Sequence, residues 1–175
     1  ELVIRLDWPD STADTVAFPA KFGDAIAIEF PLVSGTTVPD ANMGQEGGKV
    51  QIYQWKAFWQ TKAGLTKSLT KTLYPNSYID YYPPEAAKDS SSRDLLEKQY
   101  APAWNAGNPV AHRTGSAQAY VAEGFGSLTA LHQSMVEGKG IWKDGRWYVA
   151  LTLDLSQVSS DSPLKPNERT FIALA

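Results

Sequence analysis

Apolar and polar side chains alternate along several short stretches of the chain. Over 2–8 every second residue is apolar, and a similar period of two recurs over 24–32 and 49–59. Alternation of this kind is typical of strands that bury one face. The pattern therefore predicts three strands in the first third of the chain, and the third of them is rich in aromatic side chains.

The second half of the chain contains the clearest local pattern. Two strand-like runs within 139–155 are joined by Asp144-Gly145, a pair suited to the positive φ angles of a type I′ hairpin turn. Shorter strands are expected within 119–138, where Gly124 and Gly126 indicate a bulge or a close backbone approach, and a last strand over 169–175. These stretches predict a mainly β fold, and the length of 175 residues suits about one domain or a tight pair.

Residues 60–113 follow a different pattern, with few apolar residues and many Tyr, Pro and Asn turn signals. Within this segment only the pattern of residues 90–100 predicts a helix, with Ser90 or Asp89 as its N-cap. Long loops without secondary structure are uncommon in compact domains. We therefore expect a long Tyr/Pro-rich excursion that packs on the sheet or on a partner, with one or two short helices in the whole fold.

Composition excludes several classes of function. Lys and Arg number 16 and Asp and Glu 19, a net charge of −3, so the clustered positive charge that nucleic-acid binding requires is missing. The absence of Cys excludes disulfides, thiolate metal sites and covalent haem attachment. No apolar run approaches the roughly 18 to 20 residues that cross a bilayer. The first ten residues are rich in charge, so any export signal is expected to precede Glu1.

Motifs of catalysis and nucleotide binding are also missing. The stretch GFGS over 124–127 lacks the spacing of a nucleophile elbow, and neither a GxGxxG nor a Walker A motif occurs. Pairs of carboxylates such as Glu123 and Glu137 are expected to be solvated surface groups. The sequence therefore predicts no catalytic residue.

Met43 lies in a polar loop between the second and third predicted strands. A single Met most often fills a gap in a core. The alternative is that its thioether is an iron ligand, because soft sulfur suits haem iron and Gly44 lets the backbone approach a flat macrocycle. The residues alone leave both alternatives open. Met135, in a strand-like run, is interpreted as a core residue.

Seven motifs follow one another over nearly the whole chain. They are LDWPDST (6–12), FGDAIAIEFP (22–31), MG (43–44), VQIYQWKA (50–57), AGNP (106–109), AEGFGSLT (122–129) and GIWKDGRWYV (140–149). In this order they resemble the haem b-binding γ subunits of periplasmic molybdenum enzymes. The group contains ethylbenzene dehydrogenase, dimethylsulfide dehydrogenase, chlorate reductase and selenate reductase.

This resemblance implies an antiparallel β-sandwich that forms a single domain over residues 1–175, is not catalytic and binds one non-covalent haem b. Such a subunit relays electrons between the iron–sulfur β subunit and a soluble cytochrome, while the molybdenum α subunit acts on the substrate in the periplasm. The resemblance implies Met43 as one axial iron ligand and a Lys expected beyond Ala175 as the other, so strands of the family are expected to be missing at both ends. Gly44 and Trp55 are expected at the cofactor, because a haem site needs apolar walls.

Two other functions remain open at this point. Aromatic side chains on an outer sheet face also suit stacking on sugar rings, so the chain could be a carbohydrate-binding module with Trp55, Trp59 or Trp104 in line. The third possibility is an interaction subunit whose Tyr/Pro-rich segment binds a larger partner.

Overall fold

Two compact units make up the chain in the computed structural model. One consists of residues 1–65 and 114–175, and the other of residues 66–113. The bounds of the second unit nearly match those of the predicted excursion, 60–113. The structure describes residues 1–15, 22–32, 35, 37–60, 74–76, 78, 89–99, 102–108, 115–132, 135–158, 162 and 164–175.

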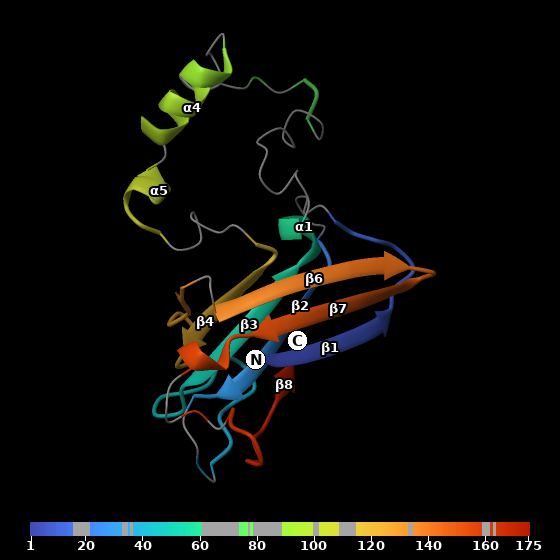
Figure 1. Ribbon diagram of the computed structural model, residues 1–175, viewed down its shortest axis with the longest axis vertical. Helices are drawn as coiled ribbons and strands as arrows, with labels where there is room; N and C mark the ends of the chain where they lie inside the picture. The colour runs from blue at the N-terminus through green and yellow to red at the C-terminus, as the bar shows by residue number, and fades with distance from the viewer. Residues whose placement is uncertain are drawn as a thin grey trace. The chain divides into compact units, whose positions relative to one another are not determined.

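The larger unit contains two antiparallel sheets, as Figure 1 shows. The first has the order β1-β7-β6, with bounds Leu2–Pro9, Arg146–Leu153 and Val136–Lys143. The second has the order β5-β4-β3-β2-β8, with bounds Thr129–Ala130, Ala117–Ala122, Val50–Lys56, Ala25–Pro31 and Ala173–Leu174. The predicted mainly β sandwich is confirmed.

The predicted hairpin is formed by β6 and β7. Asp144 and Gly145 have φ angles of 52° and 75°, so both adopt the left-handed conformation of a type I′ turn. On β7 the inward positions are Trp147, Val149, Leu151 and Leu153, all buried, whereas Tyr148 is exposed. The predicted last strand is shorter than expected: β8 contains Ala173 and Leu174, which pair with β2, and Ala175 adds two backbone hydrogen bonds with Ala27.

The third strand ends earlier than its alternating pattern indicates. β3 stops at Lys56, and the short helix α1 (Ala57–Gln60) follows. This helix brings Gln60 to the edge of β6, where its Oε1 accepts hydrogen bonds from the Gly140 N–H (2.7 Å) and from the indole N–H of Trp55 (3.2 Å). These bonds explain why the chain turns here instead of continuing the strand.

Aromatic rings fill the space between the two sheets. Trp55 of β3 has no exposed surface, and its ring meets that of Trp147 edge to face at a centroid distance of 5.1 Å. Two glycines of β6 make room for the indole: a Cβ on Gly140 would lie 2.2 Å from the Trp55 ring, and one on Gly138 would lie 2.8 Å away. The strand and the ring therefore pack in direct contact.

The smaller unit contains helix α4 (Ser90–Gln99) and the short helix α5 (Pro102–Asn105). Asp89 caps α4, because its carboxylate accepts from the backbone N–H (2.8 Å) and the hydroxyl (2.7 Å) of Ser92. In the larger unit, the 3₁₀ helix η3 (Leu155–Gln157) follows β7 and is capped by Asp154. None of the helices in the described part of the chain is both long and apolar enough to cross a membrane.

Asp24 links the two sheets and makes stability depend on pH. Its Oδ2 accepts from the Trp147 indole N–H (2.8 Å) and from the Asp14 backbone N–H (2.6 Å). Burial raises the pKa of Asp24 above its ordinary value of 3.8, with the charges of Asp10 and Asp14 adding to the rise and the two hydrogen bonds opposing it.

The raised pKa of Asp24 gives a prediction that urea denaturation at a series of pH values tests. Above pH 3.8 the folded protein keeps this proton longer than the unfolded chain, so the free energy of unfolding falls as the pH rises through the raised pKa. Asp24→Asn removes this titration. The variant should therefore gain stability relative to the wild type as the pH rises from 3.8 through the raised pKa. A difference in the free energy of unfolding that stays constant with pH would contradict the raised pKa of Asp24.

Candidate functional site

The outer face of the five-stranded sheet carries a second apolar cluster, on the side turned away from the three-stranded sheet. Its buried members are Val50, Ile52, Tyr120 and Ala122, and the half-buried residues that pack on them are Ala27, Met43, Trp59 and Ala130. An outer sheet face is usually polar because it meets water. An apolar outer face therefore marks a place where a ligand or a partner can bind.

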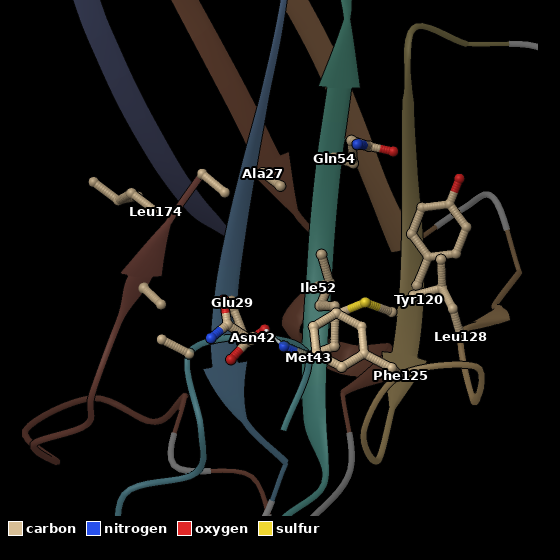
Figure 2. A pocket seen from close by; sticks show the side chains of 13 residues that line it. Ala27, Glu29, Asn42, Met43, Ile52, Gln54, Tyr120, Phe125, Leu128 and Leu174 are labelled. Atoms are coloured by element: carbon tan, nitrogen blue, oxygen red, sulfur yellow. Dashed lines mark hydrogen bonds between the residues drawn. The ribbon is translucent and has the colours of Figure 1, made fainter. Parts of the chain in front are cut away.

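A cavity of about 250 Å³ opens on this face. Figure 2 shows that its walls come from β2, β3, β4, β8 and two loops, and that the Met43 thioether lies across β3 between Ile52 and Tyr120. Phe125, Leu128 and Leu174 stand at its rim with exposed side chains, and 83% of the Phe125 surface is exposed. The cavity is therefore mainly apolar, with a sulfur atom on its floor.

The backbone of Met43 has an unusual conformation. Its φ of 72° lies in the left-handed region, which costs a non-glycine residue of order 1–3 kcal/mol. Its N–H donates to Glu29 Oε2 (3.2 Å), its carbonyl accepts from the Gly124 N–H (2.8 Å), and the Gly44 N–H donates to the Asp40 carbonyl (2.9 Å). These bonds hold the turn that directs the thioether onto the sheet.

Gly44 is necessary for this turn. Its φ is 70°, and a Cβ at this position would lie 2.3 Å from the carbonyl oxygen of Gly48. Gly44 is buried beneath its own loop and does not line the cavity. Its observed role is thus to let the chain fold tightly after Met43, whereas an approach to a macrocycle remains a prediction.

The loop after β4 is tied to the Met43 loop. The Glu123 carboxylate accepts from the Gly47 N–H (2.9 Å) and pairs with Lys49 (3.5 Å). Gly124 and Gly126 have φ angles of 100° and 87°, whereas a Cβ at Gly124 would make only an ordinary contact of 3.9 Å with the Gln45 Cα and one at Gly126 would meet nothing within 4 Å. The predicted close approach is therefore not observed, and the positive φ angles explain the two glycines. The two loops together place Phe125 beside Met43, a neighbour that the sequence pattern did not reveal.

Among the described residues that line this cavity, Glu29 is the one acidic side chain. Burial raises the pKa of its carboxyl group, and the charge of Asp40 adds to the rise, whereas the hydrogen bond from the Met43 N–H opposes it. A half-buried carboxylate on an apolar face needs a compensating partner, and the Met43 N–H supplies one.

Trp55 lies on the opposite face of the five-stranded sheet. Met43 and the cavity are on the outer face, whereas the Trp55 ring lies between the sheets, so the structure does not bring Trp55 together with Met43. The same burial prevents Trp55 from stacking on a sugar ring. Trp59 does touch the outer cluster, with Lys56 Nζ 4.9 Å from its ring centroid, and the side chain of Trp104 lies outside the described residues.

The residues at this cavity fit one side of a haem site. They supply a soft sulfur ligand and apolar walls, which are the features that a haem requires from a protein. The only other methionine of the sequence, Met135, is 7% exposed in the inter-sheet core. Within the described part of the chain, no group of three or more His, Cys, Asp or Glu side chains is placed to hold a metal ion. The volume lies below the 300–1,000 Å³ range common for ligand sites, so a haem would also contact groups beyond this cavity.

Comparison with known proteins gives one informative similarity. No family model matches the chain. The chain is 25% identical over 176 residues to a protein of Haloferax mediterranei that is provisionally named respiratory nitrate reductase heme subunit ORF7. The alignment covers 99% of this chain and 43% of that protein. The chain therefore spans less than half the length of the relative that it matches.

Proposed function

We propose that the chain is a haem-binding electron-transfer module of a respiratory oxidoreductase, without catalytic residues of its own. The observation that carries this proposal is the conformation of Met43. Its backbone is left-handed and held by two hydrogen bonds, and its thioether lies on the floor of an apolar cavity. The name of the Haloferax mediterranei relative, a heme subunit of a reductase, supports the same function. The cofactor that we propose is one non-covalent haem b.

The residues at the cavity and in the Met43 turn would have different roles in this proposal. Met43 would bind the iron through its thioether, and Ile52, Tyr120 and Phe125 would form the apolar surroundings that exclude water and tune the potential. Gly44 maintains the turn that presents Met43. The bound haem would supply one-electron chemistry, which needs no general base and no nucleophile.

The residue that would bind the iron together with Met43 is proposed to be a Lys that follows Ala175. Ala175 lines the same cavity as Met43 and is fixed to β2 by two hydrogen bonds with Ala27, of 2.7 and 3.0 Å. A residue that continues the chain would therefore begin at the rim of the cavity. A Lys ligand must be neutral, so it would have to be enclosed well enough for burial to lower its pKa.

The partners and the compartment are proposed from the family resemblance. They are an iron–sulfur subunit and a molybdenum subunit of the same complex, a soluble cytochrome as electron partner, and the periplasm. Co-purification of these subunits with the full-length protein from its own source would support the assignment. Isolation of the full-length protein from its own source with a complete haem but without these subunits would contradict the proposed partners.

The haem itself is tested by optical spectroscopy. We expect the full-length protein, produced with haem available, to bind one haem that gives the pyridine haemochrome of haem b and is reduced reversibly by one electron. A folded protein that stays colourless under these conditions and binds polysaccharide would replace the proposal with carbohydrate binding.

A further inference from the structure

Glu29 is attached to a rigid part of the fold. It lies on β2, where its neighbours in register are Ile52 of β3 on one side and Ala173 of β8 on the other. Its side chain points to the outer face, lines the cavity and accepts the hydrogen bond from the Met43 N–H. A paired strand thus offers a fixed acceptor to a loop residue that must hold an unfavourable backbone conformation.

We propose that Glu29 is a positioning residue that sets the place of the Met43 thioether. This inference rests on the proposed haem function and assigns to Glu29 a role in it. Without the acceptor, the Met43 N–H would face an apolar half-buried surface unpaired, and the turn could leave its left-handed conformation. The sulfur would then no longer be held over β3. The bonds from Gly124 to the Met43 carbonyl and from Gly44 to Asp40 would remain.

Three variants separate the acceptor from the charge. Glu29→Gln keeps an oxygen that can accept from the Met43 N–H and removes the charge, whereas Glu29→Ala removes both. Glu46→Gln is the matched control, because Glu46 is an exposed carboxylate on the same loop as Met43.

The first measurement uses the haem-loaded full-length protein. We expect Glu29→Ala to raise the rate of haem loss to an acceptor protein roughly tenfold and to have a lower reduction potential than Glu29→Gln, which lacks the same charge. Glu29→Gln and Glu46→Gln should change the rate by less than about threefold. Loss of haem from Glu29→Gln as fast as from Glu29→Ala would overturn a positioning role and indicate a charge effect. Equal retention in all three variants would overturn it as well.

The second measurement needs no haem. In the haem-free full-length protein with labelled methionine methyl groups, the Met43 signal, assigned by its loss in Met43→Leu, should move in Glu29→Ala and stay in place in Glu29→Gln, with Met135 as internal reference. An unmoved Met43 signal in Glu29→Ala would overturn the inference even if the haem proposal holds. If the Met43 signal moves in Glu29→Ala but the wild-type protein never binds haem, the positioning role would stand and the proposed haem function would be rejected.

Discussion

Replacing Met43 by Leu is expected to weaken haem retention by about a hundredfold and to lower the reduction potential, with little effect on the fold. Loss of groups that only support a metal ligand already costs 10–100-fold, so loss of the ligand itself should reach the upper end of that range. Methionine ligation raises haem potentials, so its removal should lower this one. The measurements are the rate of haem transfer to an acceptor protein and a redox titration.

Leu and Ala at position 43 distinguish ligation from packing. Leu keeps the apolar volume and should cost less than about 1.5 kcal/mol in the free energy of unfolding. If Met43 only fills the outer cluster, Met43→Ala should destabilise the protein by up to about 2–5 kcal/mol, and neither variant should change the spectrum or the potential. Met135→Leu is the matched control in the inter-sheet core. An unchanged potential in Met43→Leu would remove Met43 as a ligand.

Replacing Trp55 by Ala is expected to cost about 3–5 kcal/mol of unfolding free energy, the largest loss of stability that we predict from one side chain. The Trp55 ring is fully enclosed, meets Trp147 and lies directly under the glycines of β6. The strand above cannot collapse far into the space left behind, because β6 is held in register by β7. For a chain of this size the melting temperature should fall by on the order of 10 °C.

Trp142→Ala is the control for the core variant. Trp142 is 37% exposed near the hairpin turn, and its indole N–H donates to the Asp10 carbonyl (3.0 Å). Its loss should cost about 1 kcal/mol, the value of a typical hydrogen bond. Equal losses from Trp55→Ala and Trp142→Ala in chemical denaturation would contradict the inter-sheet position of Trp55. If instead Trp55→Ala leaves the free energy of unfolding unchanged but alters the haem spectrum, Trp55 would be a residue that contacts the cofactor.

Local patterns were sufficient to predict the strands and the hairpin. A period of two identifies β1, and Asp144-Gly145 satisfies the steric requirement of its turn by itself. The pattern of β3 is ambiguous, because Val50 and Ile52 are apolar on one face while Tyr53 and Trp55 are apolar on the other. Alternation alone does not say which face meets the second sheet.

Long-range packing decides that ambiguity. The glycines of β6 lie more than 80 positions beyond Trp55 in the sequence, and only the fold shows that they leave room for its ring. The cavity is likewise built from segments that lie far apart in the sequence. The Met43 loop and the Gly124 loop meet through a backbone hydrogen bond, which no local sequence pattern indicates. Met43 could therefore be singled out from the sequence, whereas Glu29, Tyr120 and Phe125 could not.

Iron X-ray absorption of the haem-loaded full-length protein tests the central claim most directly, because it reports which elements are bound to the metal. This chain has no Cys, and its other Met is buried between the sheets. We therefore predict one sulfur neighbour of the iron in the wild type and its disappearance in Met43→Leu. A wild-type spectrum with only nitrogen or oxygen neighbours, or a sulfur neighbour that persists in Met43→Leu, would contradict the account.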